Sequence, residues 1–198
     1  MEFSKKEEGV WKMSSKNEPL FPSNQELCAN PADLINMSKS GCYKWWATEK
    51  RLAEFLEQLD KTKFEEVNTI ETDSSNKWYC IYVGKADVIG NRLVNHAKSD
   101  FYKSTLRQSI ASLIKDFKNF KSKQKIEDAV DEILKDLRVT FIQVEESKVK
   151  NKEEKLINGE YLRLLNIDKN THRQAEKIMP ILKRKRKELR EKFPKEDA

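Results

Sequence analysis

The sequence lacks any apolar run of the roughly 18 residues that a membrane-spanning helix needs. Its beginning, MEFSKKEEGVWKM, also lacks the apolar segment of a signal peptide. Cysteine is scarce, and Cys28, Cys42 and Cys80 are odd in number and form no CxxC pair. This pattern indicates neither a disulfide framework nor a zinc site. We therefore expect a cytoplasmic protein whose thiols are free and buried.

The excess of positive charge lies at one end of the chain. The formal net charge is +6, and residues 183–195 (KRKRKELREKFPK) hold eight of the 39 basic residues and two of the 33 acidic ones. The rest of the chain is therefore balanced. A concentrated basic segment is attracted to phosphate groups, although a solvated helix face can have the same composition. The candidates for phosphate contacts are five consecutive residues, Lys183, Arg184, Lys185, Arg186 and Lys187.

Strand and helix patterns alternate along the middle of the chain. Apolar or β-branched runs predict strands at 41–47, 78–84 and 138–144. Apolar residues at helical spacing predict helices at 48–60, from about 90, and at 105–117, 125–136, 152–163 and 171–192. The polar segment 72–76 is predicted to be a turn, and the charged segment 145–152 a loop.

This order indicates an α/β (α+β) fold, with a small, mixed, mainly antiparallel three-stranded sheet flanked by helices. Residues 1–38 show no sustained period and are predicted to be an N-terminal extension. The folded domain is expected at 39–170, and a basic C-terminal helix at 171–198.

Side chains that suit phosphate chemistry gather around the second predicted strand. Tyr43 lies in the first strand and Tyr82 in the second, and Lys85 follows three residues later. Arg92 and His96 are four residues apart on the next predicted helix, so they point the same way. Cations of this kind stabilise a charged transition state, and a phenol or an imidazole can transfer a proton. The set therefore suits the cleavage of a phosphodiester.

In their order, these residues resemble the GIY-YIG nuclease family. Its two defining motifs are matched by GCY at 41–43 and YVG at 82–84, with Arg92 ten positions after Tyr82. A helical glutamate and a later asparagine complete the site of that family, and EEKLINGEYLRLLN (153–166) fits this part. One departure is Cys42, which stands where the family usually has an aliphatic residue.

Two adjacent glutamates are candidates for the metal-binding position that the resemblance implies. Glu154 lies twelve residues before Asn166, which is the spacing expected in the family. Glu153 has instead the expected spacing to the apolar pair 156–157. Both stay candidates, with a slight preference for Glu154.

The resemblance implies a metal-dependent DNA endonuclease that leaves 5′-phosphate and 3′-hydroxyl ends. The glutamate would hold one Mg²⁺ (or Mn²⁺) ion, Tyr43 would be the general base, and Arg92 would bind the scissile phosphate. Asn166 would support its loop and the glutamate, while His96 would act as a base or hold a phosphate. Tyr82 would orient the water or the phosphate, and Lys85 would help to lower the pKa of a tyrosine.

The resemblance implies that the partner is DNA and that no membrane is involved. A homodimer is expected if the enzyme cuts both strands. The alternative is a nuclease fold that binds nucleic acid without cleaving it. The presence of Tyr43, Arg92 and the two glutamates argues against that alternative.

Overall fold

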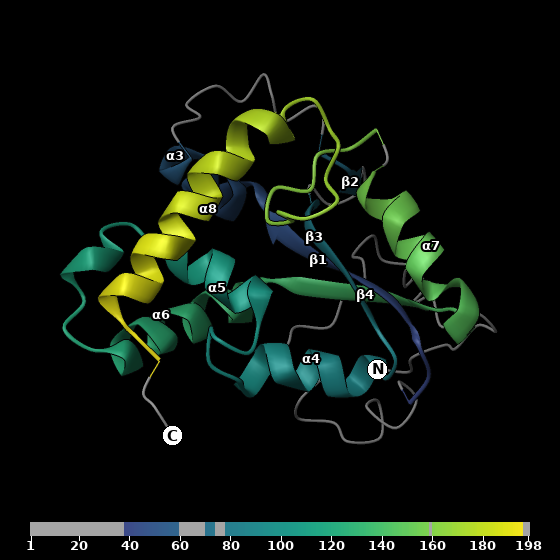
Figure 1. Cartoon of the computed structure of the whole chain (residues 1–198), viewed down its shortest axis with the longest axis horizontal. Helices are drawn as coiled ribbons and strands as arrows, with labels where there is room; N and C mark the ends of the chain where they lie inside the picture. The colour runs from purple at the N-terminus through teal and green to yellow at the C-terminus, as the bar shows by residue number, and fades with distance from the viewer. Residues whose placement is uncertain (1–37, 60–69, 74–77, 159, 196–198) are drawn as a thin grey trace, which may run out of the picture.

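The computed structural model describes residues 38–59, 70–73, 78–158 and 160–195 (Figure 1). The predicted N-terminal extension lies outside these residues except for Ser38, and Cys28 lies outside them too. Within the described ranges, no helix has both the length and the apolar character needed to cross a membrane.

An antiparallel sheet with the strand order β2-β3-β1-β4 forms the centre of the domain. Its long strands are β1 (Gly41–Thr48), β3 (Trp78–Ala86) and β4 (Arg138–Gln143). These confirm the three predicted strands and the α+β class. The fourth strand, β2 (Thr72–Asp73), pairs with the beginning of β3, so the predicted turn at 72–76 starts with a short edge strand.

Strand β1 divides the interior into two clusters, because successive side chains of a strand point to opposite faces. Tyr43, Trp45 and Ala47 belong to the main core, whereas Trp46 belongs to a smaller cluster on the other face. The main core is filled from α3 (Glu49–Gln58), α4 (Ile89–Lys98), α5 (Thr105–Ser112), α6 (Lys123–Asp136) and α8 (Ala175–Lys192).

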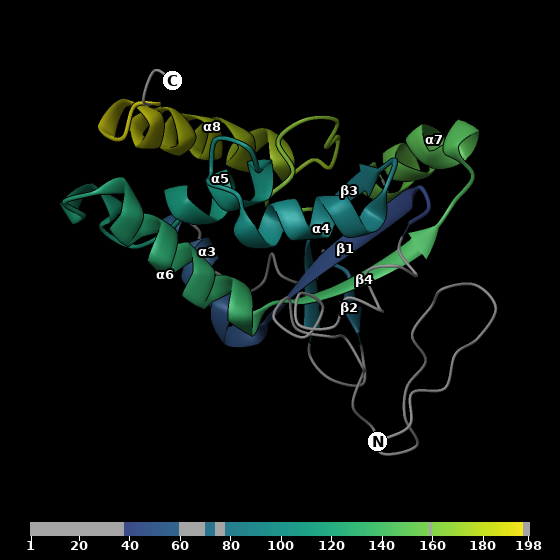
Figure 2. The ribbon, with the colours of Figure 1, turned by 90° about the horizontal axis from the view of Figure 1, so that it is seen from below.

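The helices thus cover the two faces of the sheet to different extents. The smaller cluster is closed by Ile157 of α7 (Glu146–Ile157). Figure 2 shows α8 as an outer layer over α5, with α4 and α5 between it and the sheet. Tyr43 is consequently on the side of the sheet with the thicker helical cover.

A β-bulge lies beside Tyr82. Trp45 pairs with Tyr82 and Trp46 pairs with Cys80, so Ile81 is the extra residue of β3. Neighbouring strand residues normally face opposite sides of a sheet, but a bulge turns one of them. Here Ile81 and Tyr82 both join the main core.

The structure corrects the prediction for residues 145–163. Helix α7 spans Glu146–Ile157, so the predicted charged loop is almost entirely helical and the helix predicted at 152–163 ends early. Of its side chains, Val149 and Ile157 are buried. Because so few apolar positions mark this helix, its period is hidden among charged residues.

The leucines after α7 account for the rest of the error. Leu162, Leu164 and Leu165 are buried, but they lie in an irregular segment that fills the core. The spacing of these buried leucines resembles that of apolar residues in a helix. The predicted helix was therefore extended too far, to residue 163, whereas α7 ends at Ile157.

Two further helices are shorter than predicted. Helix α5 ends at Ser112 rather than at residue 117, and a 3₁₀ helix, η2 (Phe117–Asn119), follows it. Between them Asp116 has a φ of 54°, a left-handed conformation that an α-helix does not accommodate. Helix α8 begins at Ala175 rather than at residue 171.

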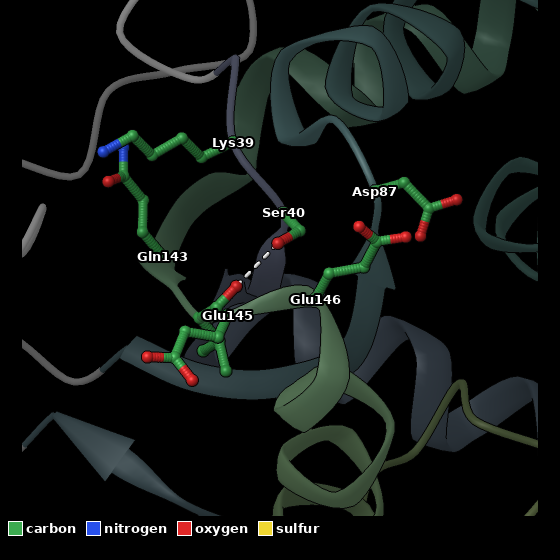
Figure 3. A pocket seen from close by; sticks show the side chains of 7 residues that line it. Lys39, Ser40, Asp87, Gln143, Glu145 and Glu146 are labelled. Carbon is green, nitrogen blue, oxygen red and sulfur yellow. Dashed lines mark hydrogen bonds between the residues drawn. The ribbon is translucent and has the colours of Figure 1, made fainter.

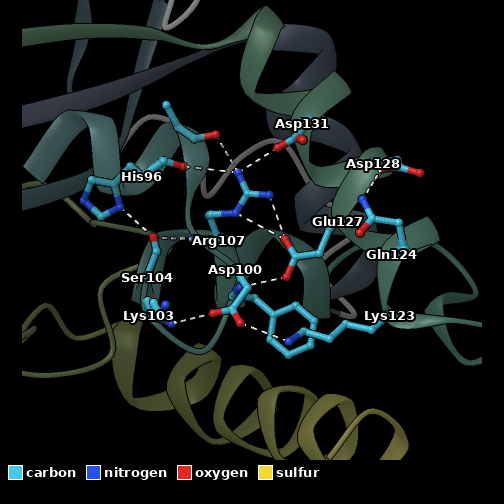
Figure 4. A network of polar contacts seen from close by, with 12 residues as sticks. His96, Asp100, Lys103, Ser104, Arg107, Lys123, Gln124, Glu127, Asp128 and Asp131 are labelled. Atoms are coloured by element: carbon cyan, nitrogen blue, oxygen red, sulfur yellow. Dashed lines mark hydrogen bonds and ion pairs between the residues drawn. The ribbon is translucent and has the colours of Figure 1, made fainter. Parts of the chain in front are cut away.

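A buried ion pair fastens α4, α5 and α6 to one another (Figure 4). Arg107 of α5 is only 2% exposed, and its Nη2 lies 2.7 Å from Oε2 of Glu127 in α6. Its Nη1 donates to the carbonyl oxygens of His96 and Ala97 near the end of α4, at 3.3 and 3.1 Å. The other oxygen of Glu127 accepts the N–H of Phe101 at 2.8 Å. Arg107 therefore has a structural role.

Candidate active site

Tyr43 crosses the neighbouring strand above a glycine. Its backbone pairs with that of Gly84 in β3, and a Cβ atom at residue 84 would lie 2.3 Å from the hydroxyl oxygen of Tyr43. No side chain fits in that space, so the glycine of YVG is required for the tyrosine of GCY to take its position. The Tyr43 side chain is 1% exposed.

Two side chains of α4 meet the Tyr43 hydroxyl. Nε2 of His96 lies 2.8 Å from Oη of Tyr43, and Nε of Arg92 donates to the same oxygen at 3.3 Å. The four-residue spacing of Arg92 and His96 places both on one helix face. Three residues of the predicted set are therefore in direct contact.

Tyr82 completes an aromatic cluster around the imidazole. Its ring centre lies 6.4 Å from that of Tyr43 and 6.1 Å from that of His96. The Tyr82 hydroxyl is 3.1 Å from Oγ1 of Thr105 at the start of α5. Tyr82 is thus held between β3 and α5, beside the Tyr43 phenol.

Burial keeps the Tyr43 hydroxyl and the His96 imidazole uncharged. It raises the pKa of Tyr43 far above the usual range, reinforced by Tyr82 and opposed by Arg92. It lowers the pKa of His96 to about 3, and the positive charges of Arg92 and Arg107 act in the same direction. Near neutral pH, Tyr43 is therefore a phenol and His96 a neutral imidazole.

Arg92 stays positively charged. Partial burial acts to lower its pKa, but the phenols of Tyr43 and Tyr82 outweigh this effect and raise the pKa overall. A fixed guanidinium next to a buried hydroxyl favours the ionised form of that hydroxyl.

Helix α7 presents Glu153 rather than Glu154 to the sheet. Val149, Glu153 and Ile157 are four residues apart and share one helix face. The side chain of Glu153 is 13% exposed, and that of Glu154 37%. The charge of Glu153 also acts to raise the pKa of Tyr43. Its position favours Glu153 over the residue that the spacing to Asn166 favoured.

Two lysines surround the Glu153 carboxylate. Its Oε2 lies 3.8 Å from Nζ of Lys85 on β3 and 3.4 Å from Nζ of Lys169, which follows Asn166 in the chain. Lys169 also contacts Glu154 at 3.2 Å. Two ammonium groups therefore lie close to this carboxylate. Lys85 is at the predicted place, whereas nothing in the sequence singled out Lys169.

A single carboxylate fits a hard divalent cation. No group of three His, Cys, Asp or Glu side chains suited to a metal occurs in the part of the chain that the structure describes. Mg²⁺ often binds through one or two carboxylates while keeping several waters and taking substrate phosphate oxygens. Glu153 offers such an oxygen donor within electrostatic reach of Tyr43.

Asn166 supports β3. Its side-chain oxygen accepts the N–H of Val83 and its amide donates to the Val83 carbonyl, both at 2.8 Å. The N–H of Leu165 bonds to the Ile81 carbonyl at 2.9 Å. The loop thus provides hydrogen-bond partners for the backbone of β3 where β2 no longer pairs with it, as a further strand would. The Asn166 side chain therefore supports the backbone next to Gly84 and not a glutamate.

The basic residues of α8 do not share one environment. Lys183, Arg184 and Lys187 are exposed, and Lys185 is half-buried. Arg186 is buried and its Nη2 donates to the Leu165 carbonyl at 3.3 Å, to the Thr105 carbonyl at 3.2 Å, and to Oγ of Ser109. Arg186 therefore joins α8 to α5 and to the Asn166 loop, and this position does not suit the predicted DNA contact.

His96 is also less accessible than its predicted roles require. Its exposure is 0%, so it contacts Tyr43 but cannot reach a bound phosphate directly. Its other nitrogen, Nδ1, lies 2.6 Å from Oγ of Ser104. Sequence reasoning missed Ser104 and Thr105, although a Ser-Thr pair before an apolar helical stripe is a helix-start signal.

A separate pocket opens where β1 begins and β4 ends (Figure 3). It contains none of the predicted site residues, and three of its side chains are carboxylates. Negative charge repels a phosphate backbone, so nucleic acid is not expected to enter here. The lining residues are Lys39, Ser40, Asp87, Gln143, Val144, Glu145 and Glu146.

We expect Gly84→Ala to displace the Tyr43 phenol, because the new methyl group would overlap its hydroxyl. Overpacking of a close-packed interior costs about 1–3 kcal/mol, and the free energy of unfolding in urea should fall by this amount. Lys85→Ala, at the exposed neighbouring position, is the control and should change stability little. Wild-type stability of Gly84→Ala would contradict the close approach.

The low pKa of His96 predicts a loss of stability in acid. An unfolded histidine has a pKa of about 6.5, whereas that of folded His96 is about 3. Between these values the unfolded chain binds a proton that the folded one does not, so stability falls as pH falls. Between about pH 6.5 and about pH 5, the free energy of unfolding should fall by roughly 2 kcal/mol.

Urea unfolding of a His96→Gln variant at these two pH values should therefore show a weaker pH dependence than the wild type. His172→Gln is the matched control, since His172 is only partly buried, and it should keep most of the wild-type dependence. Equal slopes for wild type and His96→Gln would contradict a neutral, buried imidazole.

Comparison with known proteins agrees with this geometry. Residues 41–188 match the family model described as the GIY-YIG catalytic domain. The matched segment begins at the GCY motif and ends within α8. Comparisons with curated proteins and with solved structures found no match. The match covers well over half of the chain, and the chain therefore belongs to the GIY-YIG family of nuclease domains.

Proposed function

We propose that this chain is a metal-dependent DNA endonuclease whose site is built by Tyr43, Arg92 and Glu153. The proposal rests on one observation above all: the guanidinium of Arg92 and the imidazole of His96 converge on the Tyr43 hydroxyl. The carboxylate of Glu153 acts electrostatically on the same hydroxyl from another helix. Family membership supports nuclease activity, and the residues needed for it are present.

Tyr43 is the proposed general base. As a water oxygen bonds to phosphorus, the water proton passes to Oη of ionised Tyr43 and the bond from phosphorus to the 3′ oxygen breaks. The leaving oxygen takes a proton from solvent, so the products carry a 5′-phosphate and a 3′-hydroxyl. Arg92 stabilises both the phenolate and the charge on the phosphate.

The raised pKa of Tyr43 means that the base needs additional positive charge before it ionises. Glu153 would hold the divalent cation that cleavage needs, with Mg²⁺ or Mn²⁺ as the candidates. When bound, such an ion supplies positive charge to the leaving oxygen. Lys85 and Lys169 adjust the charge around this carboxylate, while Asn166 holds the strand that carries Gly84.

The DNA backbone is proposed to contact the outer face of α8. Lys183, Arg184 and Lys187 are exposed there, and α8 packs next to η2, which adds exposed Lys118. Two acidic residues of α8 moderate this face, since Glu188 pairs with Lys118 at 2.9 Å and Glu191 with Lys187 at 3.7 Å. This surface would supply binding that depends on salt and little on sequence.

Nicking of supercoiled plasmid DNA with Mg²⁺ tests the assigned roles. Arg92→Ala should lower the rate at least about 100-fold, the usual effect of removing a charge-stabilising donor. Glu153→Gln keeps the size of the side chain but removes its charge, and it should reduce nicking similarly. Glu154→Gln is the matched control and should stay close to wild type.

The outcomes separate the alternatives. Persistent nicking by Arg92→Ala or Glu153→Gln would remove the role assigned to that residue. If the wild-type chain binds DNA without cutting it, the domain is a binding module on a nuclease fold. A linear rather than nicked first product would support the homodimer that cutting of both strands implies.

The α8 surface has its own test in the salt dependence of DNA affinity. Replacing Lys183, Arg184 and Lys187 together by Gln should weaken binding and reduce the slope of log K against log salt by about 0.9 for each phosphate that the variant no longer neutralises. Filter binding at several salt concentrations measures this slope. A control variant with Lys50, Lys135 and Lys150 replaced by Gln has the same net charge but should keep the wild-type slope.

A further inference from the structure

Lys169 lies in a turn that buried side chains hold on both sides. The asparagines that flank it, Asn166 and Asn170, are 7% and 4% exposed. Asn166 bonds to the backbone N–H and carbonyl of Val83 in β3, and the Asn170 amide donates to the Arg163 carbonyl at 2.8 Å. The backbone of Lys169 is therefore fixed relative to β3.

The backbone of Lys169 also has a conformation that glycine adopts more readily than lysine. Its φ is 61°, which lies in the left-handed region that a Cβ atom disfavours. Among the described residues, Asp116 is the other non-glycine residue with a positive φ. Glycine would suit this turn better on backbone grounds alone, so the presence of a lysine needs an explanation from its side chain.

The ammonium group of Lys169 bridges the two candidate glutamates of α7. Its Nζ lies 3.4 Å from Oε2 of Glu153 and 3.2 Å from Oε1 of Glu154. Lys85 is farther from the same Oε2, at 3.8 Å, which is beyond hydrogen-bond distance. Of these two lysines, Lys169 is therefore the one that bonds to the Glu153 carboxylate.

A divalent cation at Glu153 needs the same carboxylate. Mg²⁺ and Mn²⁺ bind directly to carboxylate oxygens, whereas Oε2 of Glu153 already accepts a hydrogen bond from Lys169. A lysine is positively charged at neutral pH, and two positive charges at one carboxylate repel each other. The ion must therefore displace the ammonium group or bind next to it, and both lower its affinity.

We propose that Lys169 occupies the cation position at Glu153 in the metal-free protein and so lowers the affinity of the free protein for a divalent ion. The inference rests on the proposed function, which places the metal at Glu153. A DNA phosphate brings negative charge and further oxygen ligands to the ion. Lys169 thereby makes metal binding depend on the presence of the substrate.

Titration of the full chain with Mn²⁺ in the absence of DNA tests this competition. Electron paramagnetic resonance measures the free ion and so gives the Kd. Lys169→Gln removes the charge and should lower the Kd about three- to tenfold at low salt, as expected for one unit charge near a divalent ion in water. The difference should shrink as salt increases, because exposed charges are screened. A Kd of Lys169→Gln that is no lower than that of the wild type would overturn the proposal.

Two further variants separate the charge of Lys169 from other effects. Lys169→Arg keeps the positive charge on another long, unbranched side chain, so it should keep the wild-type Kd. Lys155→Gln is the matched control, because Lys155 is an exposed lysine of α7 that lies two positions from Glu153 and thus on the opposite side of the helix. If Lys155→Gln lowers the Kd as much as Lys169→Gln, the cause is net charge and the proposal is wrong.

Nicking with Mn²⁺ tests the dependence on substrate. Because DNA phosphates compensate the charge of Lys169, the Mn²⁺ concentration for half-maximal nicking should change less in Lys169→Gln than the Kd of the free protein does. Equal changes would overturn this part of the proposal.

Two outcomes distinguish this inference from the proposed function. If Glu153→Gln binds Mn²⁺ as tightly as the wild type, the metal does not bind at Glu153, and both the inference and that part of the proposed function are wrong. If Lys169→Gln lowers the Kd as expected but the wild-type chain cleaves no DNA, the proposed function fails while the competition at Glu153 stands.

Discussion

The close approach of the Tyr43 phenol to Gly84 is the constraint on which the rest of the site depends. The two residues pair across β1 and β3, and the phenol occupies the space where any side chain at residue 84 would begin. This brings the hydroxyl to the face of α4 that carries Arg92 and His96. The family motifs GCY and YVG are thus two halves of one packing contact, with a functional hydroxyl at its end.

Three buried polar arrangements hold the elements around that contact. Asn166 replaces a missing strand partner of β3, and Arg107 joins α4 to α5 and α6. Arg186 fastens α8 to α5 and to the Asn166 loop. Each is a buried side chain that pairs with backbone groups of a distant segment, which is costly to break once the partners are desolvated. The C-terminal helix is accordingly packed against the core and bonded to two other segments.

Much of the fold follows from local patterns. The three long strands are strongly apolar or β-branched, and α3 and α6 have clear apolar stripes, so both kinds of element were predictable. The prediction failed for α7 because Val149 and Ile157 are its only buried side chains, and for 158–163 because buried leucines occupy an irregular loop. The motif tyrosines, Arg92, His96 and Asn166 were found from their order, which reflects a family pattern more than any periodicity.

By itself, the sequence determined the strands, the candidate residues and the excess basic charge of the C-terminal segment, since these depend on residue type and spacing. Only the tertiary structure decided which glutamate faces the sheet, because Glu153 and Glu154 differ by one position and helix geometry turns just one of them towards Lys85. It also decided that Arg186 and His96 are buried. Exposure and hydrogen-bond partners come from segments far apart in the chain, and a local pattern contains no information about them.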